Sequence, residues 1–223
     1  MLVHLAALVL ASAPAPAAEP APPRYYVILF GGQSIPFKAR TAHTWATFVK
    51  TAPTADGAVS IEQVTISWLP AEGPVQPLRI RSVAGKNRTL EETFAITANN
   101  NARVSMWGPF ETDATRYELA VAQATALNSG AVRFRSVDSF RGNRSVQHCV
   151  HAITYADPNL QWLRQPIPVR YGEPGTSKLA GRYADSGAFV GTATHDWLLP
   201  ALGLDRQPVV RREPGERVPR QWR

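Results

Sequence analysis

The chain has 223 residues, 44% of them hydrophobic, which is enough for one well-packed domain but not for two full ones. Its formal net charge is +7, but the segment Arg206 to Arg223 holds six Arg against Glu213 and Glu216, a net +4 that leaves +3 for the rest. The folded part is therefore nearly balanced. With no zinc-finger spacing, RNA-binding aromatic signature or glycine-rich phosphate loop, these features argue against a nucleic-acid partner.

The N-terminal end has the pattern of an export signal. Met1 to Ala11 is a short apolar run, and the following residues up to Ala18 are mostly Ala and Pro. This predicts a signal peptide over residues 1–18, although the usual Lys or Arg is missing, and the run is too short to cross a bilayer. We therefore expect an exported protein, periplasmic or extracellular.

The apolar patterns predict one domain over residues 24–204. Strands are expected at 24–30, 41–50, 62–69, 104–109 and 131–137, helices at 88–98, 113–129 and 192–202, and irregular chain from 158 to 191. The pair 43–50 and 62–69 is typical of an antiparallel hairpin. The fold class is therefore α+β, an antiparallel sheet with packed helices. Residues 205–223 form an expected disordered Arg/Pro-rich tail with only weak contact to anionic surfaces.

Cys149 is the only cysteine in the sequence. The spacing of Val146, Val150 and Ile153 predicts a short helix with Ser145 as its N-cap, which puts Cys149 near the first turn. Backbone N–H groups and the helix dipole stabilise a thiolate there. In an oxidising compartment a lone cysteine indicates an intermolecular bridge or a free reactive thiol. The alternative is a buried thiol that serves as a small hydrophobic core residue.

A metal site is not expected. The chain has no second cysteine and no histidine pair at i, i+4 spacing. His148 and His151 are three residues apart, but no third ligand lies near them in sequence. We therefore expect neither metal nor cofactor.

Two motifs, in this order, resemble the circularly permuted papain-like folds of NlpC-type peptidases and lecithin retinol acyltransferase. In those families a strand motif close to His-Trp-x-x-Tyr-Val precedes a nucleophile in Asn-Cys-x-His or Asn-Cys-x-x at a helix start. Here the residues read His43-Thr-Trp45-Ala-Thr-Phe48-Val49 and His148-Cys149-Val150-His151. One extra residue separates His43 from Trp45, and His148 stands where the families have Asn. The resemblance covers two short motifs within residues 25–156.

The resemblance implies a thiol hydrolase or acyltransferase that acts on an amide or ester bond in cell-wall peptide or lipid. Cys149 would be the nucleophile and His43 its base, with Ser67 or Thr65 as the residue that orients the imidazole. The oxyanion would be bound by the Cys149 backbone N–H and by a second donor, for which Gln33 and Gln147 are the candidates. The partner would then be an acyl-containing substrate.

Two further hypotheses stay open at this point. The first is a non-catalytic secreted binding or structural domain, a degenerate papain-like fold, which predicts an inert Cys149 thiol and a solvent-inaccessible His43. The second is a peripheral envelope protein held on anionic surfaces by its basic tail.

Overall fold

The computed structural model describes residues 21–137, 144–161 and 171–216. Within these residues a central sheet of five strands has the order β3-β2-β1-β6-β9. Its strands are β1 (Arg24–Ser34), β2 (His43–Pro53), β3 (Val59–Ile66), β6 (Ala102–Thr112) and β9 (Val209–Arg212). A smaller sheet contains β4 (Trp68–Pro70), β5 (Val83–Asn87), β7 (Arg133–Phe134) and β8 (Val146–Gln147).

The helices are α1 (Leu90–Asn99), α2 (Ala114–Asn128), α3 (Cys149–Thr154), α4 (Glu173–Asp185) and α5 (Leu198–Ala201), with a 3₁₀ turn η1 (Leu204–Arg206). This mixture of helices and mainly antiparallel strands confirms the expected α+β class. Among the described helices, none is long and apolar enough to cross a membrane.

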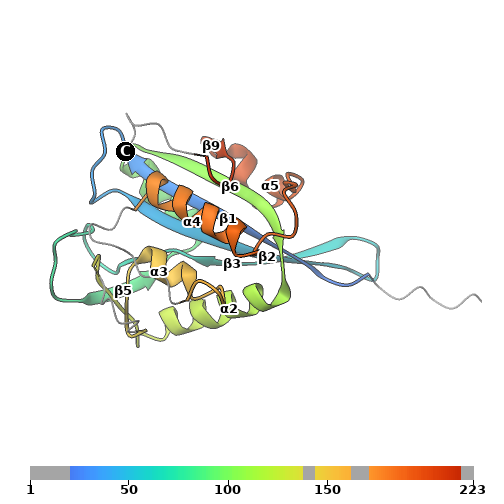
Figure 1. The fold of residues 1–223 in the computed structure, drawn as a ribbon, viewed down its shortest axis with the longest axis horizontal. Coiled ribbons are helices and arrows are strands. Elements are labelled where there is room, and N and C mark those ends of the chain that lie inside the picture. The colour runs from blue at the N-terminus through green and yellow to red at the C-terminus, as the bar shows by residue number, and fades with distance from the viewer. Residues whose placement is uncertain (1–20, 138–143, 162–170, 217–223) are drawn as a thin grey trace, which may run out of the picture.

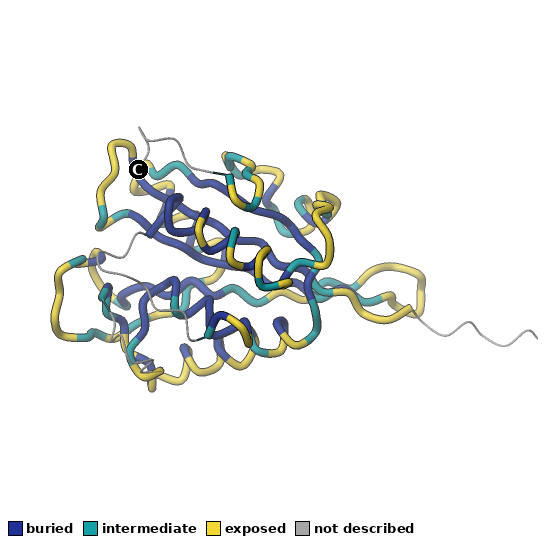
Figure 2. The backbone as a smooth tube through the Cα atoms, viewed as in Figure 1, coloured by how far each residue is buried: buried dark blue, intermediate teal, exposed yellow. Residues whose placement is uncertain are grey.

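The central sheet has helices on both of its faces (Figure 1). Because side chains alternate along a strand, Ala46 and Phe48 of β2 point to one face and Trp45 to the other. Ala46 and Phe48 belong to the main core cluster, which also holds residues of α2, α3 and α4. Trp45 belongs to a second cluster with Leu90 and Phe94 of α1. Strands β1, β2 and β6 between these layers are buried along most of their length (Figure 2).

The start of β2 lies beyond the end of its neighbour β3. β1 pairs with β2 from Arg24↔Thr51 to Gly32↔His43, whereas β3 pairs with β2 only between Pro53 and Ala46. After Ile66 the chain bends into β4, which joins the smaller sheet. His43 therefore lies where the two sheets separate, which leaves room for a pocket at that end.

The first strand is longer than predicted. We expected Gly31 and Gly32 to end it, but β1 continues to Ser34. A Cβ on Gly31 would lie 2.6 Å from Thr176 Oγ1 and 2.9 Å from the backbone of Glu173. Glycine is used there because α4 packs directly against the strand, not because the strand ends.

Helix α4 lies in a segment that we expected to be irregular. Its start, Gly172-Glu173-Pro174-Gly175, has the composition of a loop. Gly172 has φ 72°, and Pro174 lies in the first turn, where a missing N–H leaves no hydrogen bond unmade. Leu179, Ala180 and Tyr183 then anchor the helix in the main core.

The C-terminal segment is ordered further than predicted. β9 pairs in parallel with β6, from Val104↔Val209 to Trp107↔Arg212, so the sheet is mixed. Trp107 Nε1 donates to the Glu213 carbonyl oxygen at 3.2 Å and Ser177 Oγ to that of Glu216 at 2.5 Å. The tail that we expected to be disordered from residue 205 thus joins the sheet through Arg212 and is hydrogen-bonded to the domain at Glu213 and Glu216. Residues 217–223 and the expected signal peptide, 1–18, lie outside the described ranges.

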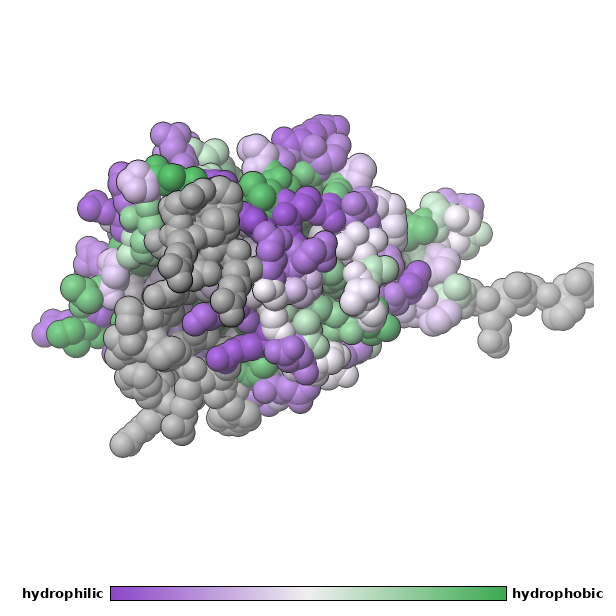
Figure 3. Space-filling model, turned by 45° about the horizontal axis from the view of Figure 1, so that its top comes forward, coloured by the Kyte–Doolittle hydropathy of each residue, from purple (hydrophilic) through white to green (hydrophobic). Residues whose placement is uncertain are grey.

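The loop between β4 and β5 projects from one end of the molecule (Figure 1). It exposes Leu78 and Ile80, at 92% and 85%, which alternate with Arg79 and Arg81 along the chain. Hydrophobic and hydrophilic surface lie side by side at that end (Figure 3).

Candidate functional site

His43, the first residue of β2, is almost completely buried, with 4% of its surface exposed. Its ring stacks on Trp45, with 5.4 Å between ring centroids and 15° between the planes. Burial disfavours the charged imidazolium and lowers the pKa of His43 to about 3. His43 is therefore a neutral hydrogen-bonding group at neutral pH.

The structure brings His43 and Ser67 together, as the sequence analysis proposed. His43 Nε2 lies 2.8 Å from Ser67 Oγ, and Thr93 Oγ1 of α1 donates to Ser67 Oγ at 2.7 Å. Thr93 Oγ1 also lies 2.7 Å from the carbonyl oxygen of Thr89. Sequence analysis missed Thr93; its position four residues after the N-cap Thr89, on the buried side of α1, is the signal that marks it.

The direction of these hydrogen bonds sets the imidazole tautomer. Thr93 has one hydroxyl proton for its two oxygen neighbours. When it donates to Ser67, the Ser67 proton is directed to His43 Nε2, and Nδ1 carries the ring hydrogen. When it donates to Thr89, the order reverses and Nδ1 is an acceptor. In the described part of the chain His43 Nδ1 has no hydrogen-bond partner, although it is buried. Such a group has a free-energy cost that a ligand would remove.

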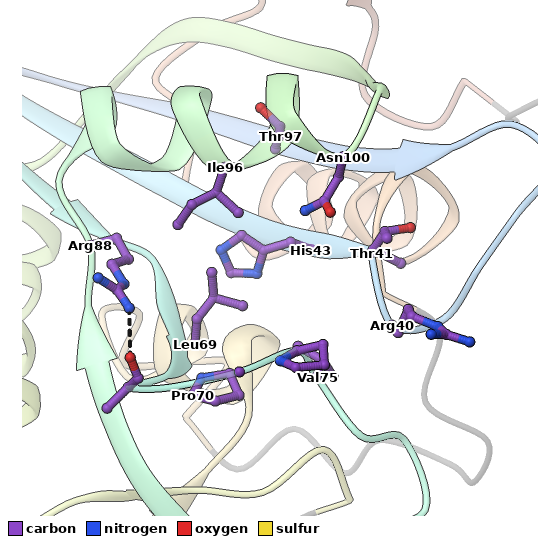
Figure 4. Close-up of a pocket in the computed structure, with 14 residues that line it drawn as sticks. Arg40, Thr41, His43, Leu69, Pro70, Val75, Arg88, Ile96, Thr97 and Asn100 are labelled. Carbon is purple, nitrogen blue, oxygen red and sulfur yellow. Dashed lines mark hydrogen bonds between the residues drawn. The ribbon is translucent and has the colours of Figure 1, made fainter.

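The His43 ring lies in the wall of a cavity of about 360 Å³ (Figure 4). The walls come from the start of β2, from β4 and the loop after it, and from α1. The lining residues are Arg40, Thr41, Ala42, His43, Leu69, Pro70, Ala71, Gly73, Pro74, Val75, Arg88, Ile96, Thr97 and Asn100. They include two arginines, a patch of aliphatic side chains and no carboxylate.

Arg88, at the entry to α1, contributes a second buried nitrogen. Its Nη2 donates to the carbonyl oxygen of Ala71 at 2.9 Å, which fixes the guanidinium against the loop after β4 (Figure 4). Its Nη1 lies 3.9 Å from Glu92 Oε1. Arg88 Nε is buried and has no partner within the described residues. Two unsatisfied nitrogens thus belong to residues that line one pocket; sequence reasoning had assigned no role to Arg88.

Cys149 lies in a different layer. It is the first residue of α3, and the N-cap is His148, not Ser145 as predicted. His148 Nδ1 accepts from the backbone N–H groups of Val150 and His151, at 3.1 and 3.2 Å. Cys149 is 3% exposed and packs in the main core cluster, on the sheet face opposite Trp45. Since His43 stacks on Trp45, the structure does not bring the thiol to the imidazole.

The other residues proposed from the sequence form hydrogen bonds that join neighbouring parts of the fold. Thr65 Oγ1 lies 2.9 Å from Thr47 Oγ1. Gln147 Oε1 accepts from Gln123 Nε2 at 2.6 Å, and Gln147 Nε2 donates to the Arg144 carbonyl oxygen at 2.7 Å. Gln33 Oε1 accepts from the backbone N–H of Glu173 at 3.2 Å. These contacts join β3 to β2, β8 to α2 and to the turn that precedes β8, and β1 to α4, and none of them joins either glutamine to Cys149.

His148 and His151 stack on each other, with 4.1 Å between ring centroids. Among the described residues, no three His, Cys, Asp or Glu side chains form a group that could hold a metal ion. Comparison with known proteins yields no matching family, no similar curated protein and no similar solved structure.

Proposed function

We propose that this chain is an exported, non-catalytic binding domain whose ligand site is the pocket beside His43. The observation that carries the proposal is the side of the sheet on which His43 lies. Its ring is in the wall of a cavity on the α1 side, with a buried nitrogen that no described residue satisfies. Pockets with aliphatic walls and a few convergent polar groups are typical small-molecule sites.

The environment of Cys149 supports a structural role for the thiol. Cys149 is buried among aliphatic and aromatic side chains of the main core, and it is not one of the residues that line the pocket. Structural cysteines are typically buried, as Cys149 is, whereas reactive cysteines are partly exposed and close to positive charge. We therefore expect Cys149 to react only when the protein unfolds.

The rate of alkylation of Cys149 by iodoacetamide against pH tests this function. The native protein and its His43→Ala variant should both be unreactive, or should react at the rate at which they open, whereas the denatured chain should titrate near pH 8.5. A native rate that levels off well below pH 8.5, with a midpoint that rises in His43→Ala, would show a Cys–His pair and reject the proposal.

A thiol hydrolase or acyltransferase acting on an amide or ester bond stays as the second candidate. It is favoured by the short contact between His43 Nε2 and Ser67 Oγ, because a hydrogen bond to one ring nitrogen is what orients a catalytic imidazole. This candidate requires a rearrangement that brings Cys149 to the α1 side of the sheet. The alkylation experiment decides between the two candidates.

A further inference from the structure

We infer that the pocket beside His43 binds a small molecule that carries one carboxylate on an apolar body. The inference rests on the proposed function, since it names the ligand of the same site. The charge of the lining, the two buried nitrogens without a partner and the apolar wall support it.

The lining favours a negatively charged group. Arg88 and the exposed Arg40, whose side chain extends away from His43 (Figure 4), are positively charged, and none of the lining residues is acidic. The acidic residue nearest to Arg88 in the described contacts is Glu92, which is itself bound to Lys86 Nζ at 2.9 Å. Arg88 is largely buried, with 19% of its side chain exposed, so water screens its charge less than at an open surface.

The unsatisfied nitrogens define the number of acceptors that the ligand needs. Arg88 Nε–H is a donor, and His43 Nδ1–H is a donor in the arrangement in which Thr93 donates to Ser67. A negative ligand selects that arrangement because it needs donors. A carboxylate has one oxygen for each of these two potential donors, whereas a phosphate has more acceptor oxygens and more charge.

The rest of the wall accounts for the apolar body. Leu69, Pro70, Val75 and Ile96 present aliphatic surface around the His43 ring (Figure 4). A cavity of about 360 Å³ is at the small end of the range for small-molecule sites, which run from roughly 300 to 1,000 Å³. A short aliphatic acid fits these properties, and so does the C-terminal residue of a peptide.

Isothermal titration of the full chain with hexanoate, hexanamide and hexylamine tests the inference without any mutation. Hexanoate should bind saturably, and hexanamide, of nearly the same shape, should bind at least about tenfold more weakly because it lacks the charge. Hexylamine should not bind. Equal affinity for the acid and the amide, or no binding of hexanoate, would overturn the inference.

Two variants then locate the site. Arg88→Met should weaken hexanoate binding by about tenfold or more, while the matched control Arg79→Met, an exposed arginine outside this cavity, should leave it unchanged. Ile96→Trp, which fills the cavity from a half-buried position, should abolish binding. If Arg88→Met does not fold, Ile96→Trp and the comparison of hexanoate with hexanamide still test the inference. Hexanoate binding that survives both variants would overturn the inference.

A peptide with a free C-terminal carboxylate and an apolar last residue, compared with its C-terminal amide, distinguishes the two sources of the carboxylate. Preference for the free peptide over hexanoate would assign the site to peptide ends, and preference for hexanoate would assign it to free acids. If Cys149 is inert and no carboxylate binds, this inference is rejected but the proposed function is not. A reactive Cys149 paired with His43 rejects the proposed function.

Discussion

His43 and Cys149 lie on opposite faces of the central sheet. His43 stacks on Trp45, which packs against α1, whereas Cys149 of α3 belongs to the core cluster that holds Ala46, Phe48 and residues of α2 and α4. Strand alternation along β2 places residues 43 and 45 on one face and residue 46 on the other. His43 therefore lines the pocket on the α1 side of the sheet.

Burial of His43 should make the protein less stable in acid. Its pKa is lowered to about 3 in the folded chain, against 6.5 for an ordinary histidine, so the unfolded chain binds the extra proton first. The contribution of His43 to the free energy of unfolding is therefore fully present above pH 6.5. It is lost as the pH falls from 6.5 toward 3, by up to ~5 kcal/mol. Urea unfolding of wild type and His43→Gln between pH 7 and 4 measures this loss of stability. The wild type should lose stability more steeply, and parallel pH profiles would contradict the assignment.

Glu173 should be one of the most sensitive positions in the fold. Its side chain is fully buried at the start of α4, where Arg103 donates to both carboxylate oxygens and Ser105 Oγ donates to Oε1 at 2.6 Å. Glu173→Gln removes the negative charge that pairs with Arg103, and removing one partner of a buried pair costs about 3–5 kcal/mol. Denaturant unfolding checks this, with Glu62→Gln as the control. Glu62 pairs with Lys50 at the surface, so its loss should cost less than about 1 kcal/mol.

Two glycine substitutions should have opposite effects on stability. A Cβ on Gly85 of β5 would lie 2.0 Å from Trp68 Cζ2, and Trp68 is fully buried and cannot move aside. Gly85→Ala should therefore destabilise the protein by about 2 kcal/mol or more. Gly181 is inside α4 with its nearest neighbouring atom 3.9 Å from the new Cβ, so Gly181→Ala should stabilise by about 0.5–1 kcal/mol. Thermal unfolding compares the two, and a stable Gly85→Ala protein would contradict the packing described for β4 and β5.

Local signals were enough to predict the elements with regular patterns. Helix α2 begins after Asp113, whose side chain accepts from the Arg116 N–H, and ends before Gly130, which has φ +80°. Both residues mark the helix in the sequence. The alternation along β2 also follows the prediction. By contrast, α4 has glycine and proline at its start, and its close packing on Gly31 is a contact that local sequence does not show.

The site was less accessible to sequence reasoning because its parts come from distant segments. His43, Ser67 and Thr93 meet through the pairing of β2 with β3 and the packing of α1, and Arg88 joins the pocket through its bond to Ala71. The resemblance implied Ser67 or Thr65 as the partner of His43, and the structure places Ser67 beside the ring. Whether Cys149 is a nucleophile stays a prediction. The order of two motifs in the sequence does not determine toward which face of the sheet a strand side chain points.

The most direct test of the account is ¹⁵N NMR of the imidazole of His43, assigned with a His43→Gln variant, in wild type and in Cys149→Ser near pH 6.5. We predict a neutral imidazole that is the same in both proteins, and an Nδ1 resonance that moves when hexanoate is added. This result would place His43 in the ligand pocket and apart from the thiol. An imidazolium in the wild type that becomes neutral in Cys149→Ser would show an ion pair between His43 and a Cys149 thiolate, and would contradict the account.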